Sequence, residues 1–305
     1  MVLDKETIGV TGGSGLLGRH VIYFFLKKNF KIIALSRKNP KIKHKNLDWI
    51  QIDLSNKLSY QKLDDIFKKL KCLIHIAAFV PDGKNFKKKK YINKINLHSS
   101  LNLAKWSKIN NKHFIYISGA VIYSNENKKN SEKSKIKNKS ANSYVNSKIL
   151  SEKAILKLKD KNFKLTIFRP TSIYGYGMKP NKIVSLLINK LKKNQNVKIF
   201  NYLNTRVNFI HAQDIASGIF KSYSCKSYGI FNLGQKNCIH FYDIASVVKK
   251  LINSKSKILL KSDKKFSKIL NPMDVKINLA RKKLSWRPEI SLKRGLKMQI
   301  GGKCI

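Results

Sequence analysis

The residues with the clearest chemical potential are a phenol and an ammonium four positions apart. Tyr144 and Lys148 stand in the segment Tyr-Val-Asn-Ser-Lys, and residues at i and i+4 share one face of a helix. The pKa of an unperturbed tyrosine is about 10, but a neighbouring ammonium and an oxidised nicotinamide favour the phenolate. Tyr144 could then take a proton from a substrate hydroxyl, or return it, while hydride moves to or from the nicotinamide.

A glycine-rich segment near the N-terminus predicts the cofactor for such a reaction. Gly12, Gly15 and Gly18 have the spacing G-x-x-G-x-x-G. The first glycine allows a tight turn, the second the approach of a pyrophosphate, and the third close packing of helix on strand. The N–H groups of a helix beginning at Leu16 and Leu17 would face the phosphates. A strand pattern before the segment and a helix pattern after it make the motif specific for a dinucleotide.

The residues after the second strand pattern bear on the choice between NADP and NAD. An acidic residue at this point binds the free 2′-hydroxyl of NAD, whereas an Arg accommodates the 2′-phosphate of NADP. Here the sequence reads Ser36-Arg37-Lys38, without a carboxylate. We therefore favour NADP over NAD. The alternative is that a cation here reflects only the abundance of lysine, although Arg37 is more informative than Lys38 because arginine is scarce.

The charge of the chain allows two interpretations. The 305 residues include 64 Lys and Arg and 16 Asp and Glu, which gives a formal net charge of +48. A nucleic-acid partner is one explanation. Only seven of the basic residues are Arg, however, and Arg is the side chain preferred for bidentate contacts with phosphates and bases. We favour a compositional bias towards Lys, Asn and Ile, and expect no specific nucleic acid and no membrane as a partner.

The cysteines and the N-terminal residues favour a protein of a reducing compartment. Cys72, Cys225, Cys238 and Cys304 lie far apart and form no CxxC motif, so we expect neither a metal site nor a disulfide framework. The first residues lack the apolar segment of a signal peptide. We expect a cytoplasmic protein with free thiols.

The first half of the chain alternates strand and helix patterns, which predicts an α/β fold with a doubly wound, parallel, Rossmann-type sheet. The expected strands are 7–11, 31–35, 49–52, 72–77, 113–117 and 165–168, and the expected helices are 16–27, 63–70, 92–108 and 143–157. After Pro170 the alternation loosens. The expected elements there are helices 183–192, 213–223 and 242–252, strands near 199 and at 229–233, and a terminal segment over 274–297.

Two regions follow from this pattern. Residues 1–170 are expected to form the NAD(P)-binding Rossmann domain, and residues 171–305 a smaller substrate-binding lobe that is partly interleaved with the sheet. Two polar, lysine-rich segments, 87–90 and 125–140, are expected to be solvated loops. The second precedes the Tyr144 helix, so it could also act as a lid.

Taken in order, the motifs resemble the extended short-chain dehydrogenase/reductase family, in its nucleotide-sugar epimerase/dehydratase branch. The resemblance covers nearly the whole chain. It rests on the glycine segment and the Tyr/Lys pair, and on motifs at 53–54, 75–78, 96, 169–170, 174–175, 208–211, 214, 231–234 and 284–288. It implies a nucleotide-activated sugar as the substrate. The family often forms dimers through a four-helix interface, so a homodimer is an expectation of the same kind.

The resemblance also assigns roles to individual residues. Asp53, with Leu54 beside it, would contact the adenine, and Ala77 and Ala78 would line the cofactor. Lys148 would also hold the nicotinamide ribose. The segment after Pro170 would bind the substrate, and His211 and Asp214 would be mainly structural.

The chain departs from the family at a catalytic position. The family usually carries a Ser or Thr four residues before the Tyr that corresponds to Tyr123, and this position is Gly119. Ser118 is one residue early, and in a strand a shift by one residue turns the side chain to the other face. Either Ser118 substitutes because the chain bends at the strand end, or the enzyme works without this hydroxyl, or catalysis is impaired.

Two further departures limit the reaction and the substrate. The 4,6-dehydratases of the family have Asp and Glu where this chain has Ala120 and Val121, which disfavours water elimination. The diphosphate-binding Arg of the family corresponds to Val207, with Arg206 one position away as a candidate for a substrate phosphate, and the family's Asn before Tyr-Gly is Ser172.

We therefore predict an NAD(P)-dependent epimerase or oxidoreductase acting on a nucleotide sugar. The alternatives are an NADPH-dependent reductase of a non-nucleotide carbonyl compound and a catalytically impaired NADP-binding protein.

Overall fold

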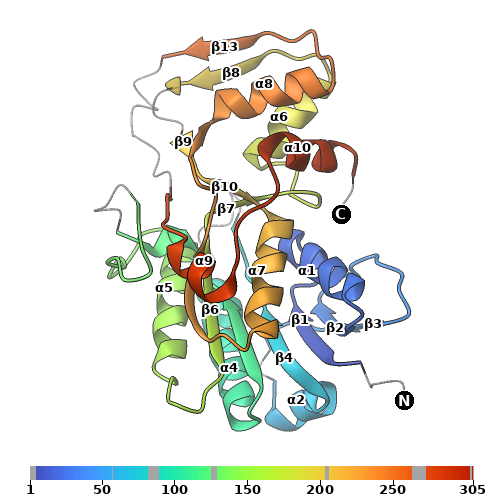
Figure 1. Cartoon of the computed structure of the whole chain (residues 1–305), viewed down its shortest axis with the longest axis vertical. Coiled ribbons are helices and arrows are strands. Elements are labelled where there is room, and N and C mark those ends of the chain that lie inside the picture. Colours follow the sequence, from blue (N-terminus) through green and yellow to red (C-terminus); the bar gives the residue numbers. More distant parts are fainter. Residues whose placement is uncertain are drawn as a thin grey trace.

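The computed structural model describes residues 5–56, 58–81, 89–124, 129–202, 206–262, 273–302 and 304, without the side chain of Lys89. Its centre is a seven-stranded parallel sheet (Figure 1). From one edge to the other, the strands are β11 (Gly229–Leu233), β6 (Leu165–Pro170), β5 (His113–Ile117), β4 (Leu70–His75), β1 (Thr7–Thr11), β2 (Lys31–Ser36) and β3 (Leu47–Gln51). This order confirms the predicted doubly wound sheet, and its β11 comes from the second half of the chain.

Helices cover both faces of this sheet. One face carries α1 (Leu16–Lys27), α7 (Ala212–Ser224) and α9 (Asn278–Leu284), and the other carries α2 (Tyr60–Phe67), α4 (Ser99–Ile109) and α5 (Ser143–Leu156). On the first face, Phe25 and Ile219 belong to one buried cluster. On the second, the rings of Phe67 and Trp106 lie 5.4 Å apart. The two apolar layers explain why β4 and β5 are almost wholly buried, as their continuous apolar sequences indicate.

A smaller group of elements packs above the carboxyl edge of the sheet (Figure 1). Three two-stranded sheets lie in this part of the molecule and on its border, and a third apolar cluster fills the space between its helices. The strands are β7 (Ser172–Tyr174) with β10 (Phe209–His211), β8 (Val197–Phe200) with β13 (Ile258–Lys261), and β9 (Arg206–Val207) with β12 (Ile239–His240). The helices are α6 (Ile183–Lys192), α8 (Phe241–Leu251) and α10 (Leu292–Ile300).

Most expected elements occur near their expected positions. Strands β3, β4 and β6 differ from their expected bounds by two residues at one or both ends, and two helices differ more clearly. Helix α2 begins at Tyr60, earlier than expected, because Ser59 caps it by accepting a hydrogen bond from the Lys62 N–H. Its predicted last residue, Leu70, instead opens β4. The helix expected over 92–108 is interrupted: α3 (Lys89–Asn93) leads into a π-helical turn, η1 (Lys94–His98), and only then into α4. Within the described residues, no helix is long and apolar enough to cross a membrane.

The two lysine-rich segments lie partly outside the described residues. Of the first, 87 and 88 are outside, and Lys89 opens α3. Of the second, 125–128 are outside, and the remainder is held against the protein by backbone hydrogen bonds. The Ser124 N–H donates to the Lys135 carbonyl at 3.0 Å, and the Lys137 N–H donates to the Ile122 carbonyl at 2.9 Å.

Candidate active site

The carboxyl ends of parallel strands bring the predicted site residues to one edge of the sheet. Gly12 follows β1, Ala77 follows β4, and Ser118 follows β5. In an open α/β sheet, ligands bind outside this edge. The sheet therefore places the glycine segment and the end of β5, where Lys148 also makes contact, on the same side.

The glycine segment forms a cradle in which side chains have no room. Gly12 has a φ of +74°, and a Cβ there would lie 2.9 Å from the Ala77 backbone nitrogen. A Cβ on Gly18 would lie only 2.2 Å from the Gly12 carbonyl oxygen. The turn after β1 is thus pressed between the end of β4 and the first turn of α1. Glycine is required for this close approach of backbone segments.

Three side chains beneath the cradle fix it to the sheet. The hydroxyl of Thr11 accepts hydrogen bonds from the backbone N–H groups of Ile76 and Ala77, both at 3.2 Å. It also lies 2.7 Å from Nδ1 of His75, whose Nε2 lies 2.8 Å from the Ser100 hydroxyl. Burial lowers the pKa of His75 to about 3, and the Lys148 charge adds to this effect. A neutral imidazole therefore connects the ends of β1 and β4 to α4, a role that the sequence alone did not indicate.

The first turn of α1 is open to an anion. Its N-cap residue is Gly15, no side chain caps the helix, and no acidic residue lies in its first turn. Leu17 and Gly18 are buried, while Leu16 is half-buried. Arg19 Nε donates to the Ser14 carbonyl at 3.1 Å, which holds the turn closed at one side. Uncapped N–H groups with a glycine cradle fit the pyrophosphate of a dinucleotide.

The residues predicted for the adenosine end surround the carboxyl ends of β2, β3 and β4. Arg37 is exposed, and its Nη1 donates to the Tyr91 hydroxyl at 2.9 Å. The carboxylate of Asp53 accepts from the Ser55 N–H at 2.8 Å, and Leu54 is buried. Ala77 and Ala78 are half-buried just beyond β4.

Helix α5 begins at Ser143, directly before Tyr144. Asn142 caps it, because its side-chain oxygen accepts hydrogen bonds from the N–H groups of Tyr144 at 3.0 Å and Val145 at 3.2 Å. Tyr144 therefore lies in the first turn and is half-buried. Burial raises the pKa of its phenol to about 12, so the phenol is protonated at neutral pH.

Lys148 lies one turn further along α5 and is buried, with 3% of its surface exposed. Its Nζ donates to the Ile117 carbonyl at 2.6 Å and lies 4.8 Å from the centre of the Tyr116 ring. Burial lowers the pKa of the ammonium to about 7, and the carboxylate of Glu152 opposes this shift. The ammonium is thus anchored at the last residue of β5, one residue before Ser118.

Ser118 and Gly119 follow β5, where the family resemblance predicts a catalytic hydroxyl. Ser118 is buried, and its Oγ has no hydrogen-bond partner, although its N–H donates to the Phe168 carbonyl at 2.8 Å. Gly119 has an extended backbone with a φ of 175°. A Cβ on Gly119 would lie 3.6 Å from Val121 Cγ1 and 3.9 Å from the Pro170 carbonyl oxygen, which is ordinary contact. A serine side chain therefore has room to begin at Gly119.

The π-helical turn places Asn96 against α5. The Asn96 amide donates to the Ser147 hydroxyl at 2.9 Å and to the Phe79 carbonyl at 3.1 Å, and it accepts from the Phe79 N–H at 2.7 Å. Ser147 directly precedes Lys148. Single π-turns in helices are frequent at functional sites. The sequence pointed to Asn96 only through the family resemblance, because a π-turn leaves no mark in a helical pattern.

A buried ion pair lies one turn below Lys148. One carboxylate oxygen of Glu152 accepts from both Nε and Nη2 of Arg169, and the two side chains are 1% and 2% exposed. Arg169 Nη1 also donates to the Tyr123 hydroxyl at 2.9 Å, and that hydroxyl donates to Asn232 at 2.7 Å. The pair joins α5 to β6 and, through Asn232, to β11.

The two predicted substrate residues lie on the side of the smaller group of elements. Ser172 is half-buried, and its N–H donates to the Asn208 carbonyl at 3.0 Å. Arg206 is exposed on β9, whereas Val207 is buried. Alternation along the strand thus leaves the guanidinium at the surface and the valine in the core.

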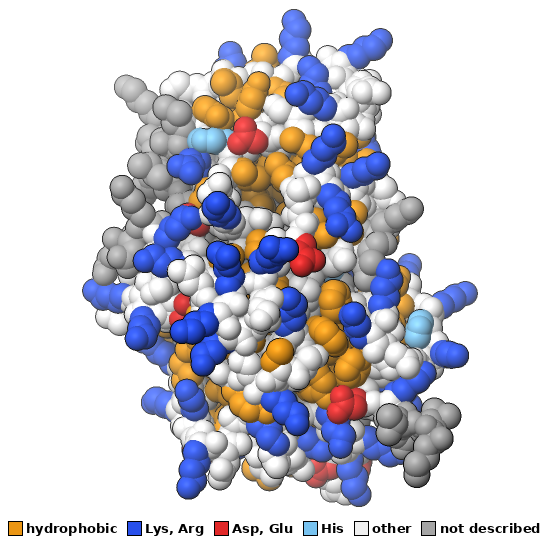
Figure 2. Space-filling model, in the orientation of Figure 1, with side chains coloured by type: hydrophobic (Ala, Val, Ile, Leu, Met, Phe, Trp, Pro, Cys, Tyr) orange, Lys and Arg blue, Asp and Glu red, His pale blue; other side chains and the backbone are white. Residues whose placement is uncertain are grey.

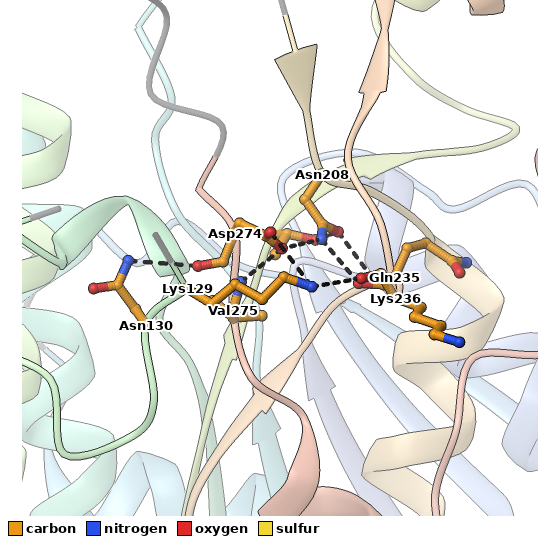
Figure 3. A network of polar contacts seen from close by, with 8 residues as sticks. Lys129, Asn130, Asn208, Gln235, Lys236, Asp274 and Val275 are labelled. Carbon is orange, nitrogen blue, oxygen red and sulfur yellow. Dashed lines mark hydrogen bonds and ion pairs between the residues drawn. The ribbon is translucent and has the colours of Figure 1, made fainter. Parts of the chain in front are cut away.

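A polar network on the same side ties four separate segments together (Figure 3). Asn208 donates to the Asp274 carboxylate at 2.8 Å and to the Gln235 carbonyl at 2.9 Å. Lys129 donates to the Lys236 carbonyl at 2.7 Å, and its Nζ lies 3.6 Å from the Asp274 carboxylate. The segment that precedes α5 is therefore fastened to the segments before β10, after β11 and before α9.

His211 and Asp214, which the resemblance makes mainly structural, both contact backbone groups of neighbouring segments. His211 caps α7 by accepting from the Gln213 N–H at 3.2 Å. Burial raises the pKa of Asp214 to about 6, although its carboxylate accepts backbone hydrogen bonds from Glu289 and Ile290. No group of three or more His, Cys, Asp or Glu side chains that could hold a metal occurs among the described residues.

The fold and the site define a Rossmann-type α/β protein with a phosphate cradle at the carboxyl edge of its sheet. The sequence model of the NAD dependent epimerase/dehydratase family matches residues 8–234. The chain belongs to this family.

Relatives with different activities are similarly distant. The chain is 25% identical over 306 residues to a putative UDP-glucose 4-epimerase of Methanocaldococcus jannaschii, covering 95% of this chain and 96% of that protein. It is 30% identical over 274 residues to the dTDP-D-glucose 4,6-dehydratase of Dictyostelium discoideum, covering 81% of this chain and 62% of that protein. Among solved structures, the UDP-glucuronic acid 4-epimerase of Bacillus cereus in complex with NAD is 20% identical, with a TM-score of 0.80 and coverage of 97% and 98%.

Proposed function

We propose that this chain is an NAD(P)-dependent enzyme that moves hydride and one proton at a hydroxyl-bearing carbon of a nucleotide-activated sugar. The observation that carries the proposal is the placement of Lys148. Its buried ammonium is anchored 2.6 Å from the Ile117 carbonyl, one helical turn from Tyr144, at the edge where the glycine cradle opens. The names of the epimerase and dehydratase relatives support a nucleotide sugar as the substrate.

The protein's own groups would handle the proton. With a pKa raised to about 12, the Tyr144 phenol is protonated and suited to donate to a carbonyl oxygen of the substrate. In the opposite direction it takes the proton of a substrate hydroxyl, which requires a lower pKa. A protonated Lys148 favours the phenolate. Glu152 helps to keep that lysine charged by raising its pKa against the effect of burial.

The cofactor would be held by groups that fit it. The N–H groups at the start of α1 and the turn at Gly12 would bind the pyrophosphate, and Asp53, Leu54, Ala77 and Ala78 would surround the adenosine. A nicotinamide supplies the hydride acceptor and donor when it is bound. We favour NADP because Arg37 stands where NAD-binding chains carry a carboxylate. The NAD in the Bacillus cereus complex makes NAD the alternative.

The residues after β5 favour epimerisation or simple oxidoreduction over dehydration. Water elimination needs an additional acid and base, and the positions where the dehydratases of this family carry them hold Ala120 and Val121. Ala120 is buried, and its side chain has no titratable group. A 4-epimerase, or an oxidoreductase acting on a hydroxyl or keto group, needs only Tyr144 and the hydride.

A second candidate is an NADPH-dependent reductase of a carbonyl compound without a nucleotide. The observation that favours it is Val207, which is buried where the family carries a diphosphate-binding Arg, with Arg206 exposed beside it. A catalytically impaired NADP-binding protein is the third possibility, motivated by Gly119.

Turnover of a panel of nucleotide sugars tests the proposal. We expect conversion that is redox-neutral for an epimerase or stoichiometric in NAD(P)H for an oxidoreductase. Tyr144→Phe should reduce it by about 100-fold or more, because the proton donor is lost. Steady NADPH consumption with simple carbonyls, and none with nucleotide sugars, would favour the second candidate. If no substrate turns over and Tyr144→Phe changes no measured property, the proposal is wrong.

A further inference from the structure

Arg37 directly follows β2, at the expected adenosine end of the site, and hydrogen bonds hold the backbone around it. The residues from Ser36 to Asn46 include no carboxylate. The backbone around Arg37 is fixed, because Gln51 Nε2 donates to its carbonyl at 3.3 Å and the Ser36 hydroxyl donates to the Lys38 carbonyl at 2.7 Å. That hydroxyl also accepts from Trp49 Nε1 at 3.1 Å. The Ser36 side chain is therefore occupied within the protein, and the side chain of Arg37 is exposed at this point.

The guanidinium of Arg37 is aimed by a residue far away in the sequence. Its Nη1 donates to the hydroxyl of Tyr91 at 2.9 Å. The Tyr91 ring is half-buried and lies edge-on to the ring of Phe79, with 5.2 Å between the centres and 82° between the planes. Tyr91 belongs to α3, so the contact reaches from the end of β2 across to the helix that follows β4.

Tyr91 is itself held by the active-site helices. Phe79 is fixed through its backbone, whose N–H and carbonyl both bond to the side chain of Asn96, at 2.7 and 3.1 Å. Asn96 in turn donates to Ser147, the neighbour of Lys148. A continuous set of contacts thus runs from α5 to Arg37. An arginine on the surface normally samples many rotamers, whereas this one has a partner with a fixed position.

The chemistry of the pair suits a phosphate. A guanidinium has five N–H donors in a planar fork, and Tyr91 uses one of them. The hydrogen bond to Tyr91 also fixes the orientation of the remaining N–H groups. A planar guanidinium can bind two phosphate oxygens at once. Holding the fork in advance lowers the entropic cost of binding. A free 2′-hydroxyl carries no charge, so it would gain much less than a 2′-phosphate from an oriented guanidinium.

We propose that Tyr91 is a positioning residue that sets cofactor specificity: it orients Arg37 for the 2′-phosphate of the adenosine ribose. Tyr91 would act through Arg37, and the two together would distinguish NADP from NAD. The inference rests on the proposed function only in so far as the chain binds NAD(P).

Equilibrium binding to the full chain tests this without any substrate. The probes are 2′,5′-ADP and 5′-ADP, measured by titration calorimetry in about 0.15 M salt, where attraction between exposed charges is screened beyond about 8 Å. We expect 2′,5′-ADP to bind more tightly. Tyr91→Phe, which keeps the ring and removes the hydroxyl, should reduce the ratio of the two affinities by about fivefold and leave the affinity for 5′-ADP unchanged.

Two further variants make the test specific. Arg37→Met should abolish the preference, and adding Tyr91→Phe to it should change nothing more, because the two residues act in series. Lys38→Met, the matched loss of a neighbouring cation, should leave the ratio within about twofold. An unchanged ratio in Tyr91→Phe, or additive effects in the double variant, would overturn the inference. If NAD binds as well as NADP and nucleotide sugars still turn over, only this inference fails. If neither probe nor either cofactor binds, the proposed function fails with it.

Discussion

At the scale of single residues, Gly119 stands where the family resemblance leads us to expect a catalytic Ser or Thr. The position lacks a hydroxyl although a larger side chain would fit, because a Cβ there makes only ordinary contacts and the backbone is extended. Nearby, the buried Ser118 hydroxyl has no partner. A buried polar group without a partner is costly, so a ligand that reaches the end of β5 could use this hydroxyl. Whether it replaces the missing one can be decided by substitution.

We predict that Gly119→Ser increases kcat for the proposed reaction by about tenfold or more, because it adds a hydrogen-bond donor beside the reacting oxygen. Gly119→Ala is the matched control, since it fills the same space without a hydroxyl, and it should not increase kcat. Steady-state kinetics on the best nucleotide sugar provide the measurement. If Ser118→Ala lowers kcat strongly and Gly119→Ser leaves it unchanged, Ser118 already supplies the donor and the prediction is wrong.

At the scale of elements, two buried histidines join α1 to the smaller group of elements. The rings of His20 on α1 and His211 at the start of α7 lie edge-on at 5.2 Å. His20 Nε2 lies 3.3 Å from the Tyr176 carbonyl, while His211 Nε2 has no hydrogen-bond partner. Gly175 lies between them, since a Cβ there would be 3.1 Å from both Nε2 atoms. Both imidazoles are fully buried, so a charge on either of them would lose its hydration.

This junction predicts acid lability. Burial lowers the pKa of His20 to about 4 and that of His211 to about 3, the latter also through His20 and Arg294. The unfolded chain therefore binds more protons below about pH 6.5. Stability is complete above that pH and falls as the pH decreases towards the folded pKa values, by about 3 kcal/mol for His20 alone.

Urea unfolding between pH 7 and pH 4 measures the effect. His20→Gln should flatten the dependence of the unfolding free energy on pH, because one buried base is removed. His44→Gln, at an exposed histidine, should leave the slope unchanged. If His20→Gln leaves the slope unchanged as well, the acid lability comes from other groups.

Some elements and site residues could be predicted from the sequence, and others could not. The strand at His113–Ile117 and the helix at Ile183–Lys192 coincide with their predicted bounds, because apolar period and boundary residues agree there. Tyr144, Lys148 and the glycines could be identified because local spacing defines them. The contacts of Thr11 with His75 and of Arg37 with Tyr91 join residues more than 50 positions apart. Such contacts depend on strand order and on the π-turn, which one sequence without relatives does not reveal.

At the scale of the whole molecule, the formal net charge is +48. Lysines and arginines are scattered over the visible face, over both the sheet domain and the smaller group of elements, with few acidic side chains between them (Figure 2). A surface selected for nucleic acid would concentrate its cations in a stripe or patch. The scattered charge nevertheless has a physical consequence, because net charge far from zero destabilises a compact state through self-repulsion.

We therefore predict that the melting temperature rises as salt increases from about 0.01 to 0.3 M, because the screening length falls from about 30 Å to under 8 Å. Each kcal/mol gained should raise it by about 2 °C. A variant with Lys159, Lys179 and Lys255, all exposed, changed to Glu lowers the charge from +48 by 6, to +42, and should melt higher at low salt. The same three positions changed to Arg keep the charge and provide the control. Should the Glu variant gain nothing over the Arg variant at low salt, repulsion between these surface charges does not limit the stability of the fold, and the prediction is wrong.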